Sequence, residues 1–117
     1  MTLDEAVALV SKWQGLLNLQ HWRIRVSAFK DKKAIGHIKW NRHYRTAYMR
    51  LDLAEVDELH IVHEVCHLFG CHFMDVADDE FQPDSMLYKR FSAAWETTTD
   101  ELASVAWGLT RESVSDG

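Results

Sequence analysis

Two histidines and a glutamate with chemical potential stand near the middle of the chain, in the run His63-Glu64-Val65-Cys66-His67. Four residues are slightly more than one helical turn, so both histidines would project from one face of a helix and could share an ion. Neutral imidazole nitrogens suit zinc. Glu64 could reach a water in the open coordination position and take its proton during attack on a peptide carbonyl. The pattern therefore predicts a zinc site able to hydrolyse peptide bonds.

A catalytic zinc normally has three protein ligands, so the prediction needs a third. We expect Glu96, because a helix near the C-terminus could pack against the metal helix and bring this carboxylate to the ion. Asp100, four residues later on the same face, would accept a hydrogen bond from the other ring nitrogen of a zinc histidine. His60 and His72 are the competing ligands. The alternative is that Glu96 and Asp100 belong to a solvated acidic face.

Several helices and strands must position these side chains. Apolar residues recur at helical spacing over residues 3–17, and Thr2 with Glu5 has the spacing of a capping box. Strict alternation predicts strands around 24–28 and 47–53, and a further strand is expected over 34–40. We expect an antiparallel meander. Helical spacing returns over 55–69, where Gly70 is expected to end the helix in the left-handed conformation.

The remainder of the chain is expected to hold an acidic connection and one more helix. Asp75, Asp78, Asp79 and Glu80 mark the connection. Pro83 with the two residues after it signals the start of a helix that would carry Glu96 and run towards Gly108. The whole predicts an α+β domain over residues 1–117: an N-terminal helix, a mainly antiparallel three-stranded sheet, the metal helix and a glutamate-bearing helix.

Composition narrows the function classes. The chain has 117 residues, enough for one domain, and 13 basic against 18 acidic residues. We expect no nucleic-acid partner, because the sequence shows no basic stripe, and no membrane association, because no apolar run is long enough to span a bilayer. Cys66 and Cys71 are expected as free thiols. A cytoplasmic monomer acting on a peptide or protein substrate is the expectation.

The motif residues resemble a known family. His63-Glu64-x-x-His67 followed by Glu96-x-x-x-Asp100 is similar to the gluzincins, the thermolysin-like metallopeptidases, and the chain length is similar to their minimal members, the minigluzincins. The resemblance extends to the order of elements and implies a zincin-like fold. It implies zinc ligation by His63, His67 and Glu96, with Glu64 as general base and acid and Asp100 as partner of a zinc histidine. Trp95 stands where larger gluzincins have an asparagine.

Two questions about function stay open at this level. A non-catalytic module held together by zinc is the alternative to a metallopeptidase of narrow activity, although a structural zinc has no need of Glu64. The group that would stabilise the oxyanion is not ranked by the sequence. Its candidates are Tyr88, His72, His43 and Tyr44. A latent enzyme, with Glu112 or Asp116 in the position of the water, is a further hypothesis.

Overall fold

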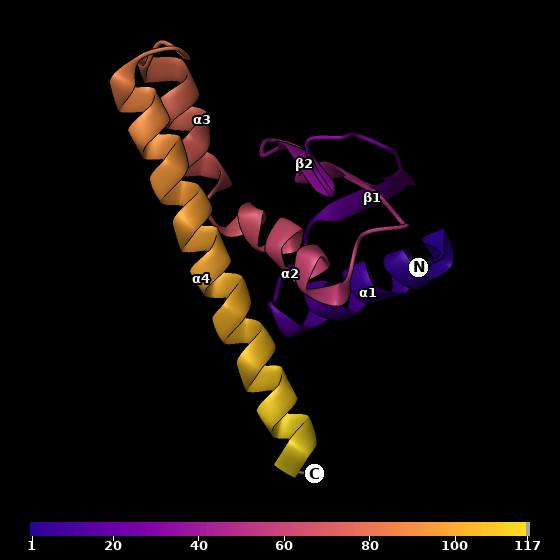
Figure 1. Cartoon of the computed structure of the whole chain (residues 1–117). Coiled ribbons are helices and arrows are strands. Elements are labelled where there is room, and N and C mark those ends of the chain that lie inside the picture. The colour runs from indigo at the N-terminus through magenta and orange to yellow at the C-terminus, as the bar shows by residue number, and fades with distance from the viewer. Residues whose placement is uncertain (117) are drawn as a thin grey trace. The chain divides into compact units, whose positions relative to one another are not determined.

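The computed structural model describes the backbone of residues 1–116 and the side chains of residues 1–110. The chain forms two compact units, Met1–Val65 and Cys66–Gly117, which are described separately below. The first contains a helix, a sheet and most of a second helix, and the second is helical (Figure 1). The α+β class is therefore confirmed, while the expectation of a single domain stays a prediction.

The N-terminal helix α1, Leu3–Leu16, begins where the capping box predicts. The Thr2 hydroxyl accepts a hydrogen bond from the Glu5 backbone N–H at 3.1 Å and satisfies one of the amides that a helix start leaves open. The buried face carries Ala6, Val10 and Trp13. The Trp13 indole donates to the carboxylate of Glu58 at 3.2 Å, which ties α1 to the first residue of the helix α2, Glu58–Cys66.

Three strands form one mixed sheet in the order β1-β3-β2. They are β1, Arg23–Ala28; β2, Gly36–Asn41; and β3, Thr46–Leu51. β1 pairs with β3 in parallel, and β2 pairs with β3 antiparallel. One face of the sheet contributes Ile38, Ala47, Met49 and Leu51 to the core.

The expected antiparallel meander is wrong, because β3 lies between the two strands that precede it in the sequence. The alternation of apolar and polar residues fixes which side chains face the core, but it does not fix which strands are neighbours. The tight link between β2 and β3 contains Arg45 at a positive φ of 53°, and its carbonyl accepts from the Arg23 amide at 2.9 Å. This contact places the start of β1 beside β3.

The helix α2 is shorter than the stretch 55–69 that was expected to be helical. After α2 the backbone forms a 3₁₀ turn, η1, His67–Phe69. Gly70 has φ −110° and ψ 10°, so the predicted left-handed conformation is wrong. The reason for glycine at this position is a close approach by another side chain, described with the site below.

The second unit contains two helices that run side by side (Figure 1). The first, α3, Cys71–Glu80, occupies the stretch expected to be an acidic connection. Its buried side is a sparse stripe of Cys71, Met74 and Ala77, three residues apart, which satisfies helical packing with little apolar bulk. The sequence signal was weak for that reason.

The long helix α4, Met86–Asp116, begins directly after Ser85 and extends beyond its expected end at Gly108. The Ser85 hydroxyl caps it by accepting from the Tyr88 amide at 3.1 Å. None of the helices in the described part of the chain combines the length and the apolar composition that a bilayer span requires.

Candidate metal centre

Within the C-terminal unit, the second histidine of the motif lies beside the predicted glutamate. The Nε2 atom of His67 is 3.3 Å from Oε1 of Glu96. The His67 side chain is 6% exposed, whereas that of Glu96 is 52% exposed. Two side chains 29 residues apart in the sequence thus present a nitrogen and a carboxylate oxygen to one another at the molecular surface.

The separation of these two atoms fits a shared ion. Ligand atoms about 2.0–2.1 Å from a tetrahedral zinc lie about 3.3–3.4 Å from each other. A charged N–H···O hydrogen bond is shorter, about 2.7–2.9 Å. The observed 3.3 Å between Nε2 of His67 and Oε1 of Glu96 therefore agrees with the separation of two ligands of one metal.

The Thr99 hydroxyl favours one tautomer of the His67 ring. Its hydroxyl donates to the Trp95 carbonyl at 2.8 Å, so its oxygen is left to accept, and that oxygen lies 3.5 Å from Nδ1 of His67. A proton on Nδ1 satisfies this contact and leaves a lone pair on Nε2, the atom facing Glu96. Thr99 is 1% exposed, so water does not compete for the contact.

Trp95 supports the same ring from the side. Its ring centroid is 4.4 Å from that of His67, with the planes inclined by 49°. The indole in turn lies against Gly70, where an added Cβ would come within 2.3 Å of the indole nitrogen and 2.9 Å of a ring carbon. Only glycine admits this approach, which explains the residue that follows η1.

In the N-terminal unit, His63 and Glu64 are adjacent near the end of α2. The His63 side chain is 21% exposed, and its Nε2 atom is 4.0 Å from a carboxylate oxygen of Glu64. Glu64 is 8% exposed and lies against the first residue of β2. A Cβ at Gly36 would come within 3.2 Å of the Glu64 Cγ, so β2 leaves room for the carboxylate by having no side chain there.

His63 precedes His67 by four residues in a continuous helical run, the spacing on which the sequence prediction rested. With Glu96 they form a group of side chains that could hold a metal ion. Two imidazole nitrogens and one carboxylate oxygen are a donor set that zinc accepts, and three protein ligands leave a position for water. The residues present therefore fit the ion that the sequence predicted.

The competing ligands have other surroundings. His60 forms a reciprocal pair with Asp57 at the start of α2: its amide donates to the Asp57 carboxylate at 2.9 Å, and its Nδ1 lies 2.8 Å from that carboxylate. The exposed ring of His72 lies against Phe73, with centroids 4.4 Å apart. Burial raises the pKa of the Cys66 thiol from 9.0 to about 11, so this thiol is protonated at neutral pH.

The remaining predicted residues are placed as follows. Asp100 is exposed on α4, directly after Thr99, and its role stays a prediction. Of the candidates for the oxyanion, the Tyr88 hydroxyl donates to Asp78 at 2.7 Å, which raises the pKa of the phenol. His43 and Tyr44 form an edge-on ring pair in the β2–β3 link. The tail residues Glu112 and Asp116 lie outside the described side chains.

Sequence reasoning missed two residues of this arrangement, Gly36 and Thr99, and gave Gly70 a different role, that of ending the helix. A signal existed only for Thr99, which follows Glu96 by three residues and so falls on the same helical face. The two glycines act through close approaches between segments distant in the sequence, which no local pattern reports.

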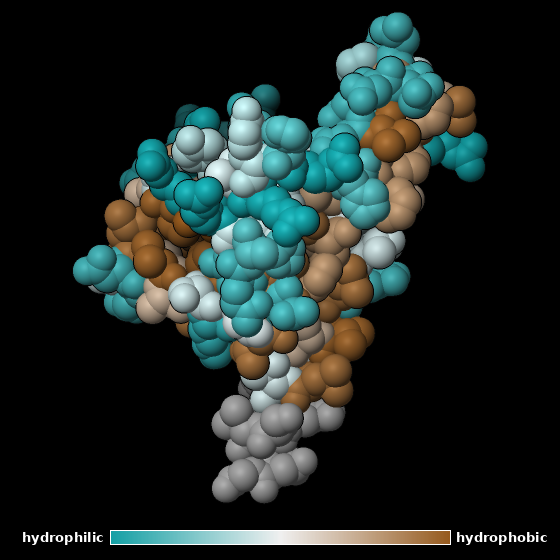
Figure 2. All heavy atoms as spheres, turned by 180° about the vertical axis from the view of Figure 1, so that it is seen from behind, coloured by the Kyte–Doolittle hydropathy of each residue, from teal (hydrophilic) through white to brown (hydrophobic). Residues whose placement is uncertain are grey.

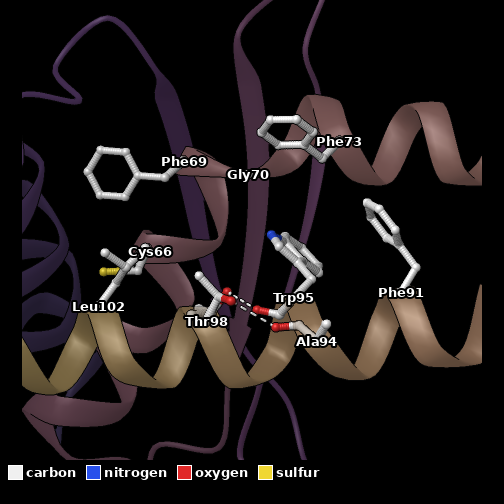
Figure 3. A pocket seen from close by; sticks show the side chains of 10 residues that line it. Cys66, Phe69, Gly70, Phe73, Phe91, Ala94, Trp95, Thr98 and Leu102 are labelled. Atoms are coloured by element: carbon white, nitrogen blue, oxygen red, sulfur yellow. Dashed lines mark hydrogen bonds between the residues drawn. The ribbon is translucent and has the colours of Figure 1, made fainter.

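An apolar cavity of about 360 Å³ lies behind the Trp95–Thr99 wall in the C-terminal unit (Figure 3). Phe69 and Phe73 line it from one side, and Phe91 and Leu102 of α4 line it from the other. Neither His67 nor Glu96 contributes to its lining. The cavity thus borders the residues that contact His67 and not the ligand atoms themselves.

Apolar side chains also gather farther along α4 (Figure 2), where Val105 and Leu109 are about 60% exposed.

Comparisons with known proteins give no assignment: no family model, no curated protein and no solved structure matches this chain.

Proposed function

We propose that the chain is a zinc-dependent metallopeptidase in which His63, His67 and Glu96 bind the metal. The observation that carries the proposal is the 3.3 Å separation of His67 Nε2 and Glu96 Oε1, on a histidine whose other nitrogen faces the Thr99 oxygen. The spacing of His63 and His67 supplies the second imidazole. A zincin-like fold, as in the minimal gluzincins, belongs to the same proposal.

Each of this chain's groups has a distinct task in peptide hydrolysis. A zinc ion bound here supplies Lewis-acid polarisation of the carbonyl and acidifies water. Glu64 would accept a proton from the attacking water and return it to the departing amine. Its burial beside Gly36 holds the carboxylate in a single place, which such a transfer requires. Asp100 would accept a hydrogen bond from a zinc histidine and so orient its ring.

The alternative is a zinc-binding module without turnover. Glu64 favours the enzyme, because an acidic side chain next to a ligand histidine has no role in a purely structural site. A structural zinc also usually has four protein ligands, and His60, the nearest further histidine, is paired with Asp57. These two observations favour hydrolysis.

Metal analysis of purified variants, combined with cleavage of an unfolded protein, tests the proposal. Wild-type protein is expected to contain one zinc per chain and to cleave the substrate. Glu96→Ala should lose most of the zinc, while Glu64→Gln should keep it and lose cleavage. Glu101→Ala is the matched control, since Glu101 is an exposed acid on the same helix, and it should retain both properties.

Two results would contradict parts of this scheme. Equal zinc content in wild type and Glu96→Ala would remove Glu96 from the ligand set. Full zinc occupancy with no cleavage by wild type, together with no difference between wild type and Glu64→Gln on any unfolded substrate, would favour the structural module.

A further inference from the structure

The positive charge of this chain is concentrated in the segment that contains the three strands. Residues 23–50 contain nine of the 13 lysines and arginines and one acidic residue, Asp31, a net charge of +8. The other residues contain four basic and 17 acidic side chains, a net charge of −13, and the two parts give the chain its −5. A mildly acidic total therefore conceals a strongly basic segment.

The strand register brings part of this charge to one face of the sheet. Tyr48 in the central strand β3 is paired with Arg25 of β1 on one side and with Lys39 of β2 on the other. Arg50, two residues along β3, is paired with His37. All five are exposed, whereas their neighbours along β2 and β3 are more buried. Side chains alternate between faces along a strand, so these five share the solvent face.

We call this surface the basic sheet face, and it consists of Arg23, Arg25, His37, Lys39, Tyr48 and Arg50. The four arginines and lysines on it make no ion pair with any described residue, and Asp31, the one acid of the segment, accepts from the Lys33 amide in its own loop. The charge of the face is consequently not neutralised within the N-terminal unit.

An aromatic ring stands at the centre of the basic sheet face. Tyr48 is 56% exposed, and the Arg25 guanidinium carbon lies 5.8 Å from its ring centroid. A depression of about 400 Å³ beside it is lined by residues of β1 and β3, including Arg23, Arg25 and Thr46. A second tyrosine, Tyr44, is 67% exposed in the β2–β3 link.

We propose that the basic sheet face binds single-stranded nucleic acid. Unpaired lysines and arginines attract the phosphate backbone, and an exposed ring between them offers a platform on which a base can stack. The face is a sheet surface without a projecting helix or ribbon to enter a duplex groove, which favours a single strand over a duplex. An acidic peptide would match the charge but would make no use of the exposed tyrosine. The inference is independent of the zinc site.

The test is a binding titration of the full chain with a fluorescently labelled oligothymidylate of about a dozen nucleotides at low salt, read by anisotropy. The double variant Arg25→Ala/Lys39→Ala should bind at least tenfold more weakly and show a smaller dependence on salt, by about 0.7 in the log–log slope for each phosphate that the protein no longer neutralises. Lys89→Ala/Arg90→Ala, which removes two exposed cations of α4, is the matched control and should bind within twofold of wild type.

The aromatic contribution is tested separately, with folding of every variant checked by circular dichroism. Tyr48→Ala should weaken binding about 5- to 100-fold, while Tyr48→Phe, which keeps the ring, should bind like wild type. Equal weakening in the sheet and α4 double variants would overturn the proposal, as would full affinity in Tyr48→Ala. Polyglutamate and unlabelled oligonucleotide are then compared as competitors for the labelled oligothymidylate, at equal concentrations of negative charge. Equal displacement by the two would overturn the proposal in favour of an acidic protein partner.

Discussion

The ring of His67 is held on three sides by groups of known chemistry. Glu96 lies at Nε2, the Thr99 oxygen lies at Nδ1, and the Trp95 indole lies against the ring. A histidine whose tautomer is fixed by a neighbour is a better metal ligand, because the lone pair is already on the nitrogen that faces the ion. If His67 binds a metal as proposed, the affinity for that metal should depend on the Thr99 hydroxyl.

We expect Thr99→Val to weaken zinc binding by about 10- to 100-fold, the usual cost of removing the partner of a ligand histidine. Valine keeps the shape of the side chain in this 1% exposed position but offers no oxygen to Nδ1. The measurement is competition for zinc with a chromophoric chelator. Thr99→Ser keeps the hydroxyl and should restore most of the affinity. Equal affinity in the valine variant and wild type would show that Thr99 only fills space.

At the residue scale, the side chains proposed to bind the metal were easier to predict from the sequence than the side chains that hold them in place. His67 and Glu96 were predicted from residue type and spacing, and the structure brings these two together. Thr99 was overlooked because Asp100 beside it is the stronger acceptor in principle. A helical threonine normally bonds to the carbonyl four residues earlier, as Thr99 does to Trp95, so its second contact depends on the tertiary arrangement.

Helices and strands position the site through two close approaches at glycine. At the start of β2, Gly36 leaves room for the buried Glu64, and after η1, Gly70 leaves room for the indole of Trp95. Neither glycine has a positive φ, so backbone conformation does not require them. The space that each glycine leaves explains its presence, and the two substitutions to alanine separate the roles proposed for Glu64 and for His67.

Gly36→Ala should lower peptidase activity at least tenfold while zinc content stays at the wild-type level. The new Cβ would lie 3.2 Å from both the Glu64 Cγ and a Leu51 methyl group, a tight contact that would press on the Glu64 side chain. Zinc analysis and cleavage of an unfolded protein measure the two properties. Gly15→Ala in α1, where nothing lies within 4 Å of the added Cβ, is the control and should leave both unchanged. An active Gly36→Ala enzyme would show that Glu64 has no fixed place.

Gly70→Ala should destabilise the chain by about 1–3 kcal/mol, the usual cost of forcing an extra methyl group into a packed position. The Trp95 indole nitrogen would lie 2.3 Å from the added Cβ, so the indole must shift. Its ring contact with His67 would shift as well. Chemical denaturation gives the free energy of unfolding. Gly108→Ala, on the open side of α4, should instead be neutral or slightly stabilising, because alanine has the higher helix propensity. Destabilisation of the same size at both positions would contradict the packing argument.

The elements themselves were predictable where a single periodicity dominates. The capping box and the apolar stripe predicted α1, and alternation predicted β1 and β3 nearly to their ends. The strand order was not predictable, because parallel pairing of β1 with β3 depends on contacts across 23 residues of sequence. The helix α3 was missed because its core side is made of small or flexible residues among many acids.

At the scale of the whole molecule, the distribution of charge says more about possible binding partners than the net charge does. The expectation of no nucleic-acid partner came from a mildly acidic total, −5, in which no basic stripe was recognised, and the proposal for the basic sheet face departs from it. A charge of +8 within residues 23–50 is local, and the field near a surface follows local charge when salt limits the range of the rest to about 10 Å. The charged residues alternate with buried ones along β2 and β3, so they form one face only when the pairing of the strands is known.

A bound metal should also be visible in the stability of the whole chain. A ligand present at about 100 times its Kd stabilises the folded state by about 2.7 kcal/mol, provided that it does not bind the unfolded chain. For a protein of this size that corresponds to a rise in Tm of about 10 °C. We therefore expect zinc added to the metal-free protein to raise Tm by this amount, as measured by calorimetry, and a chelator to reverse the change. Glu96→Ala should show a much smaller rise, whereas Glu64→Gln, which keeps the three ligands, should respond like wild type. A rise of equal size in Glu96→Ala would mean that zinc stabilises the protein from another place, and no rise in wild type would contradict the metal centre itself.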